Sequence, residues 1–162
     1  MSTSKLAILG CGNIGSAIAK GLAKSGMTKA KITLTHRKSE SLSELTQAGF
    51  QTTAENADAV QNSEIILLTV GPGQLMDLLD EISSSLSGDH LLISIVSGVS
   101  ITEIQEKVGK EIPIIRAMPN TAAALCESMT CLSSLSQFTQ GLKTAQSLFE
   151  NVGKTLVIDE TQ

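Results

Sequence analysis

Short apolar runs and segments of helical periodicity alternate along the chain. The run KLAIL at 5–9 ends at a glycine and predicts a strand. The segment at 13–26 has apolar residues at helical spacing and ends at Gly26, so it predicts a helix. The apolar face of that helix consists of Ile14, Ala17, Ile18 and Leu22. A strand is thus followed directly by a helix.

The same succession of a strand and a helix recurs further along the chain. Apolar or β-branched runs predict strands at 31–36, 63–70, 90–96 and 112–118. Periodic segments predict helices at 39–49, 72–86 and 100–109. Strands separated by helices pair in parallel through right-handed crossovers. The pattern therefore predicts an α/β fold, a doubly wound Rossmann-type sheet that is mostly parallel and has helices on both faces.

The alternation is weaker after Asn120. For this part we expect a short helix near 120–126, a strand at 128–133, a helix over 137–151 and a final strand at 154–158. No repeat, Pro-rich linker or block of charge divides the sequence. We therefore expect one domain over 1–159 and a short tail at 160–162.

Three glycines lie between the first predicted strand and the first predicted helix, in the pattern GCGNIG. In a dinucleotide-binding domain each glycine of this pattern has a separate task. Gly10 allows the tight turn, Gly12 lets a pyrophosphate approach the backbone, and Gly15 lets the helix pack closely on the strand. The N-terminus of the helix attracts the phosphates. The alternative is a turn that serves packing alone, because GxGxxG also arises by chance.

The end of the second predicted strand bears on the choice of dinucleotide. A carboxylate there would bind a ribose 2′-hydroxyl, whereas a 2′-phosphate favours cations. This sequence has His36, Arg37 and Lys38 in that place, and no acidic residue before Glu40. It therefore predicts that NADP(H) is favoured over NAD(H), unless the segment is a solvated turn that binds nothing.

Turn-forming residues follow three other predicted strands, at 69–73, 95–100 and 117–121. Open parallel sheets bind ligands at the carboxyl ends of their strands. We therefore expect a crevice for the nicotinamide ring at this edge, although Gly, Pro, Ser and Asn are also ordinary loop residues.

The composition argues against several classes of function. A net charge of −4 does not favour sequence-independent binding of nucleic acid or of an anionic membrane. No apolar run approaches the ~20 residues of a membrane span, and the first residues do not resemble a signal peptide, so we expect a cytoplasmic protein. We assign no metal ligands, because the three cysteines match neither a disulfide framework nor a zinc site. Cys126 and Cys131 are expected to be small core residues.

Several motifs together resemble one known family. GCGNIGSAIAKG, SGVS and above all IIRAMPNT followed by ESMT look like the amino-terminal half of Δ1-pyrroline-5-carboxylate reductases. The similarity extends from Lys5 to about Asp159. This resemblance implies an NAD(P)H-dependent oxidoreductase of proline biosynthesis, which transfers a hydride to the cyclic imine L-1-pyrroline-5-carboxylate. The domain over 1–159 would be its dinucleotide-binding Rossmann domain.

The resemblance also implies roles for individual residues. The pyrophosphate would lie against Gly10, Cys11, Gly12, Asn13, Ile14 and Gly15. The adenosine end would lie against His36, Arg37, Lys38 and Asn56. The nicotinamide side would be lined by Thr69, Val70, Gly71, Pro72, Ile95, Val96, Ser97 and Gly98. The substrate-binding wall would consist of Met118, Pro119, Asn120 and Thr121.

The resemblance further implies a domain that the 162-residue sequence lacks. Family enzymes continue into a helical domain that forms the dimer and brings a Ser or Thr hydroxyl to the substrate. We therefore expect a homo-oligomer only for a full-length form, and little imine reduction by this chain alone. We assign no catalytic residue within it, because His36 and His90 are expected to be structural or solvated.

Two alternatives remain open from the sequence. One is a stand-alone module that binds or senses NADP(H) without catalysis. The other is a different small-substrate NADP-dependent reductase, such as a coenzyme F420-dependent NADP oxidoreductase or a β-hydroxyacid dehydrogenase. The MPNT stretch at 118–121 is the feature that favours the pyrroline-carboxylate reductase over this second alternative.

Overall fold

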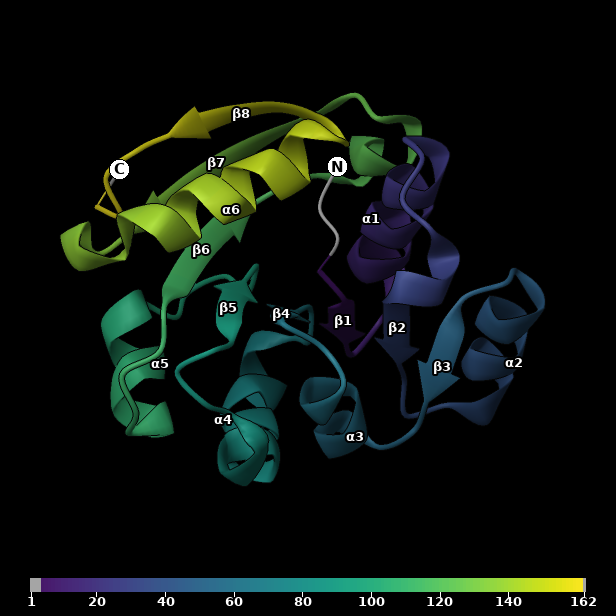
Figure 1. Ribbon diagram of the computed structural model, residues 1–162, viewed down its shortest axis with the longest axis horizontal. Coiled ribbons are helices and arrows are strands. Elements are labelled where there is room, and N and C mark those ends of the chain that lie inside the picture. The colour runs from purple at the N-terminus through teal and green to yellow at the C-terminus, as the bar shows by residue number, and fades with distance from the viewer. Residues whose placement is uncertain (1–3, 162) are drawn as a thin grey trace.

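The computed structural model describes residues 4–161, and eight strands of this part form one sheet (Figure 1). The strands are β1 (Leu6–Leu9), β2 (Ile32–Thr35), β3 (Gln51–Thr53), β4 (Ile65–Leu68), β5 (Leu91–Ser94), β6 (Ile114–Met118), β7 (Ser128–Ser134) and β8 (Gly153–Val157). Their order in the sheet is β3-β2-β1-β4-β5-β6-β7-β8. Neighbouring strands are parallel except for β6 and β7, which are antiparallel. The prediction of a mostly parallel, doubly wound sheet is confirmed.

Helices cover both faces of this sheet (Figure 1). They are α1 (Asn13–Lys24), α2 (Ser39–Gln47), α3 (Asn56–Gln61), α4 (Pro72–Ile82), α5 (Ile101–Val108) and α6 (Thr139–Glu150). One buried cluster joins the sheet to α1, α2 and α6, and a second joins it to α3, α4 and α5. Within the described part of the chain, no helix combines the length and the apolar character that crossing a membrane requires.

The central strands are buried because both of their faces are covered. All four residues of β1 are 0% exposed, and β4 is likewise buried along its whole length. Their continuous apolar sequences, LAIL and IILL, suit strands that have no solvent-facing side. Strand β1 pairs with β2 on one side and with β4 on the other. The turn that follows β1 is therefore flanked by the carboxyl ends of two other strands.

Three features of the structure differ from the sequence-based expectations. Strand β3 and helix α3, which lie between the second and third predicted strands, were not predicted. The helix expected near 120–126 is a 3-10 helix, η3 (Thr121–Leu125). Strand β7 runs antiparallel to its neighbour β6, and no direction had been predicted for this strand. The other expected elements are present, with shifts of a few residues at their ends.

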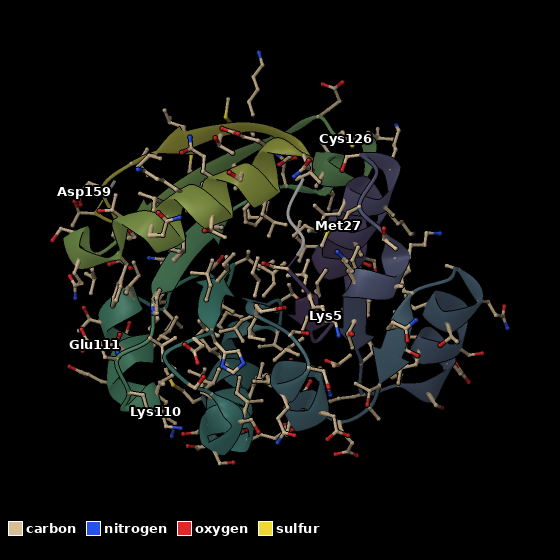
Figure 2. The ribbon with its side chains drawn as sticks, viewed as in Figure 1. Lys5, Met27, Lys110, Glu111, Cys126 and Asp159 are labelled. Carbon is tan, nitrogen blue, oxygen red and sulfur yellow. The ribbon has the colours of Figure 1, made fainter. Side chains whose placement is uncertain are left out.

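Helix α1 and η3 are in close contact at Gly21. A Cβ at Gly21 would overlap the carbonyl oxygen of Ala123, and it would come within 2.9 Å of Val152 Cγ1. Cys126, which follows η3 and lies beside α1 in Figure 2, donates its thiol hydrogen to Gly21 O at 3.4 Å. The helix that begins at the glycine turn thus also supports the segment that follows β6.

We expect Gly21→Ala to lower the free energy of unfolding by about 2 to 3 kcal/mol. The added methyl group would overlap backbone atoms of Ala123, which cannot move aside easily. Gly73→Ala is the matched control, since a Cβ at Gly73 in α4 would meet nothing within 4 Å. The free energy of unfolding of this control should rise by roughly 0.5 kcal/mol, because alanine restricts the unfolded chain more than glycine does. Urea unfolding of the two variants measures the difference, and equal midpoints would contradict the close α1–η3 contact.

Candidate functional site

Strand β1 ends in a tight turn that begins at Gly10. This residue has φ +75, and a Cβ here would overlap the side chain of Val70. The N–H of Gly10 donates to Thr35 Oγ1 at 3.0 Å, and the N–H of Cys11 donates to Thr35 O at 2.7 Å. The end of β2 therefore holds the turn, and glycine meets both the positive φ and the lack of space at position 10.

The surroundings of Gly12 differ from those of Gly10. A Cβ at Gly12 would meet no atom of the described chain closer than Gly10 O, at 4.0 Å, and its φ of −93 does not require glycine. Within residues 4–161 no side chain caps the N-terminus of α1, and its first turn has no acidic residue. The first N–H groups of α1 are therefore open to an anion that approaches over Gly12.

Gly15 lies where α1 packs against the ends of β1 and β4. A Cβ here would come within 2.9 Å of Thr69 Oγ1 and 3.2 Å of Ile8 Cγ2. The single hydrogen of the Thr69 hydroxyl is shared between the carbonyl oxygens of Leu9 at 2.7 Å and Gly10 at 3.1 Å. Position 15 thus permits a close helix–sheet contact, and the three glycines have three different environments.

A small cavity of about 60 Å³ lies beside the glycine turn, between the end of β2 and α4. It brings together three of the residues expected at the adenosine end, although these come from two different elements. These three are His36, Arg37 and Asn56. Thr35 and two carboxylates of α4, Asp77 and Glu81, also line it. Lys38 is not among the lining residues.

The basic segment after β2 lies at the surface next to this cavity. Arg37 and Lys38 are exposed, and His36 is partly buried. The N–H of Lys38 donates to His36 Nδ1 at 2.9 Å, so this ring nitrogen is an acceptor and a neutral ring carries its proton on Nε2. The segment presents two cationic side chains to solvent at the rim of the cavity.

The segments 69–72 and 95–98 follow β4 and β5. These strands pair in parallel with Leu68 opposite Ser94, so the two segments leave the sheet side by side. Several of their residues are exposed, namely Gly71, Pro72, Ser97 and Gly98. Together with the glycine turn, they form one continuous edge at the carboxyl ends of β1, β4 and β5.

The segment 118–121 follows β6 and extends the same edge. Met118 is 59% exposed, and Asn120 is also exposed, although two hydrogen bonds hold it in place. Its Oδ1 accepts from the N–H of Ala122 at 3.0 Å and caps η3, while its own N–H donates to Ser128 Oγ at 3.3 Å. The expected substrate wall thus combines exposed side chains with an asparagine that has a structural task.

Comparison with known proteins places this geometry in a family. A family model described as "NADP oxidoreductase coenzyme F420-dependent" matches residues 5–98, which is more than half of the chain. The chain belongs to this family. Over nearly its whole length it is also homologous to the amino-terminal part of pyrroline-5-carboxylate reductases. Members of the family share this nucleotide-binding oxidoreductase fold.

Three relatives show the extent of the similarity. Pyrroline-5-carboxylate reductase 1 of Dictyostelium discoideum is 41% identical over 170 residues, which cover 97% of this chain and 31% of the relative. A solved structure of a pyrroline-5-carboxylate reductase from Coxiella burnetii has a TM-score of 0.90 at 29% identity, covering 97% of this chain and 59% of that one. The solved structure of a Plasmodium falciparum pyrroline carboxylate reductase with NADP bound has a TM-score of 0.88 at 27% identity. It covers 99% of this chain, and the match covers 59% of that one. The chain therefore spans about a third to three fifths of the length of these relatives.

Several residues that line the cavity beside the glycine turn were not predicted from the sequence. Thr35, Asp77 and Glu81 line the cavity, yet none was expected there. Thr35 could have been found, because it ends the strand that precedes the basic segment. The two acidic residues could not, since they lie on the solvent-facing side of α4 and nothing in their sequence pattern indicates that they line this cavity.

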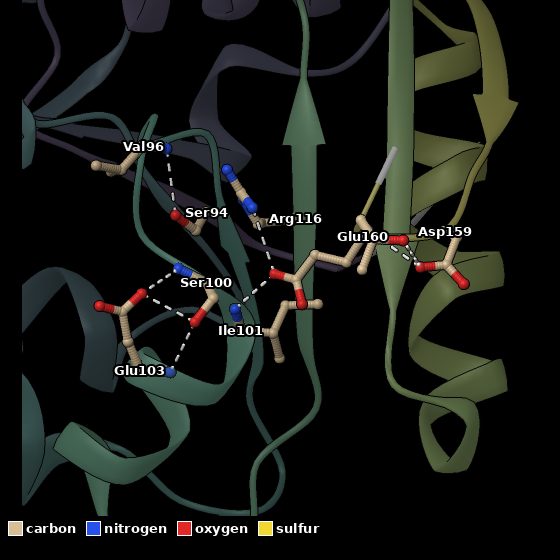
Figure 3. A network of polar contacts seen from close by, with 9 residues as sticks. Ser94, Val96, Ser100, Ile101, Glu103, Arg116, Asp159 and Glu160 are labelled. Atoms are coloured by element: carbon tan, nitrogen blue, oxygen red, sulfur yellow. Dashed lines mark hydrogen bonds and ion pairs between the residues drawn. The ribbon is translucent and has the colours of Figure 1, made fainter.

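A half-buried ion pair lies next to the segment after β6 (Figure 3). Glu160 Oε1 is 3.4 Å from Arg116 Nη1, and it accepts from the N–H of Ile101 at 2.7 Å, at the start of α5. The N-terminus of α5 is also capped by the Ser100 side chain, which accepts from the N–H of Glu103. Glu160 falls in the segment expected as a tail, and its carboxylate links β6 to α5.

The cysteines of the chain have different surroundings. Cys11, in the glycine turn, is 2% exposed, whereas Cys126 and Cys131 are only partly buried. The expectation that the latter two are core residues was wrong, because the side chains of both are only partly buried. Burial raises the pKa of the Cys11 thiol, and its contact with Ser16 and the charge of Lys20 offset this only in part.

We expect iodoacetamide to modify Cys11 much more slowly than Cys126 and Cys131 in the folded protein. The thiolate is the reactive form, and Cys11 combines burial with a raised pKa. Peptide mass spectrometry against time at pH 8 measures the three rates. In urea the three rates should become similar, and rapid modification of Cys11 in the native protein would contradict its burial.

Proposed function

We propose that this chain is the cofactor-binding part of a pyrroline-5-carboxylate reductase, in which NADPH reduces a cyclic imine. The observation that carries the proposal is the space over Gly12 at the uncapped N-terminus of α1. The homologous proteins carry the same activity in their names, and one of them is described with NADP bound. The two basic residues after β2 and the exposed edge beyond β4, β5 and β6 agree with such a ligand.

The pyrophosphate would lie over Gly12, against the N–H groups of Asn13, Ile14 and Gly15. Backbone donors at a helix N-terminus bind phosphate oxygens well, and a side chain at position 12 would take the place of the ligand. Cys11 would contribute its backbone, since its thiol is buried. Gly10 would contribute by holding the turn in place.

The adenosine end would lie at the small cavity beside His36, Arg37 and Asn56. Arg37 and Lys38 would bind the 2′-phosphate, because charge-assisted hydrogen bonds to a phosphate are stronger than neutral ones. A site that binds NAD(H) through its ribose hydroxyls normally has a carboxylate at this place in the chain. We therefore propose that NADP(H) is favoured over NAD(H).

The nicotinamide ring would lie along the segments 69–72 and 95–98, and it supplies the hydride when the cofactor is bound. The segment 118–121 would form the wall on which the imine rests, with Met118 excluding water from one side. Hydride transfer needs the reacting atoms at roughly 3 to 3.5 Å and a donor that keeps the imine nitrogen protonated. We assign no such donor within this chain, and propose that a helical domain of the longer relatives completes the site and forms the homo-oligomer.

The first prediction from the proposed function concerns the choice of cofactor. Arg37→Ala should weaken NADPH binding roughly tenfold or more and NADH binding little, because only NADPH has the 2′-phosphate. Isothermal titration calorimetry with both cofactors measures the effect. Lys24→Ala is the control, since Lys24 is an exposed cation at the far end of α1. Equal losses for the two cofactors in Arg37→Ala would refute the assignment.

The second prediction concerns the glycine turn. Gly12→Val should abolish dinucleotide binding while the fold remains intact, because the new side chain enters space that no atom of the described chain occupies. Far-UV circular dichroism and a melting curve check the fold beside the binding titration. Unchanged affinity in Gly12→Val would mean that the glycines serve helix packing alone.

A further inference from the structure

A continuous line of hydrogen bonds connects α4 to the glycine turn. The amide nitrogen of Asn56 lies 3.2 and 3.3 Å from the two carboxylate oxygens of Glu81. Asn56 Oδ1 accepts from the Thr35 hydroxyl at 2.6 Å, and Thr35 Oγ1 accepts from the N–H of Gly10 at 3.0 Å. These residues belong to α4, α3, β2 and the turn after β1, so the line joins elements that are far apart in the sequence.

The carboxylate of Glu81 sets the direction of the first two links in this line, whereas the N–H of Gly10 can only donate. An ionised carboxylate accepts hydrogen bonds and cannot donate them. The amide of Asn56 therefore turns its nitrogen toward Glu81 and its oxygen toward Thr35, since the reverse would set a carbonyl oxygen against a carboxylate. The Thr35 proton then goes to Asn56, and the oxygen of this buried hydroxyl accepts from Gly10.

We propose that Glu81 is a positioning residue for the adenosine end of the cofactor. It fixes the amide of Asn56, so that this side chain presents an N–H donor to the cavity and selects an acceptor there, a ribose or phosphate oxygen. One N–H of the amide is sufficient for the bond to Glu81, which leaves the other for the ligand. This inference rests on the proposed function, because it assigns a specificity-determining residue to the same site.

The orienting effect of Glu81 is opposite in sign to the effect of its charge. A carboxylate beside a ligand that carries phosphates repels that ligand, so removal of the charge alone would favour binding. Asp77 lies one turn earlier on α4 and lines the same cavity, but within residues 4–161 its carboxylate makes no hydrogen bond to Asn56. A comparison of Glu81 with Asp77 therefore separates the effect on the orientation of the Asn56 amide from the effect of negative charge on the ligand.

The test compares Glu81→Ala with Asp77→Ala in titrations with NADPH and with 2′,5′-ADP, a fragment that contains only the adenosine end. Glu81→Ala should bind both ligands about fivefold more weakly, which is the effect of one lost neutral hydrogen bond. Asp77→Ala should bind them at least as tightly as the wild type. Glu81→Gln should bind both ligands more tightly than Glu81→Ala, because both variants lack the charge and only the glutamine keeps an oxygen that can accept from Asn56. In an Asn56→Ala background, Glu81→Ala should have no further effect.

Hydrogen exchange at the Gly10 amide of the ligand-free protein provides a second measurement. Exchange should be faster in Glu81→Ala than in Asp77→Ala, since only the former releases the bonds that hold Thr35 in place. Equal affinities in the two variants, or an equal loss from Glu81→Ala with and without Asn56, would overturn the proposal. Wild-type protein that fails to bind NADPH would overturn the proposed function, while the exchange comparison would still decide whether Glu81 positions the turn.

Discussion

Two threonine hydroxyls hold the turn on which the site depends. Thr35, at the end of β2, accepts from the N–H of Gly10, and Thr69, after β4, donates to its carbonyl oxygen. Both polar groups of the Gly10 backbone are thus satisfied by side chains from the strands that flank β1. Buried backbone groups require such partners, and they leave the turn little freedom. The space over Gly12 and the direction of α1 follow from this arrangement.

Helix α1 connects the two parts of the candidate site. At Gly15 it packs on the sheet beneath the glycine turn, and at Gly21 it packs on the backbone of η3. The latter contact supports the segment 118–121, which precedes and enters η3. A single helix therefore carries the uncapped N–H groups at one end and supports the expected substrate wall with its other half. Displacement of α1 would move both parts together.

Elements with a strong hydrophobic pattern were predicted from the sequence, whereas elements without such a pattern were not. The runs LAIL and IILL identify buried strands because every residue faces the core. Strand β3 reads QTT and has no buried residue, so no hydrophobic period marks it. Helix α3 spans only Asn56–Gln61, which is too short to show an amphipathic repeat. Asn56 could therefore be assigned to the site only from family resemblance, and its partner Glu81 only from the structure.

The direction of β7 also could not be read from the sequence. A strand that follows a short segment can return antiparallel, whereas a parallel return needs a crossover of a dozen or more residues. The segment near 120–126 forms the 3-10 helix η3 within a short return from β6 to β7. The glycine positions, in contrast, were interpretable because their pattern lies directly between a strand and a helix.

The antiparallel pairing of β6 and β7 has a consequence for how the chain reaches its folded form. Residues 119–127 close a short loop, and the entropy lost on closing a loop grows with its length. The ladder between β6 and β7 therefore assembles at a lower entropic cost than the pairs of β1 with β4 or β2. In those pairs, a longer segment that includes a helix separates the two strands in the sequence. The expected substrate wall lies beside the pair of strands that are separated by the fewest residues in the sequence. The glycine turn lies beside pairs whose strands are separated by many more residues.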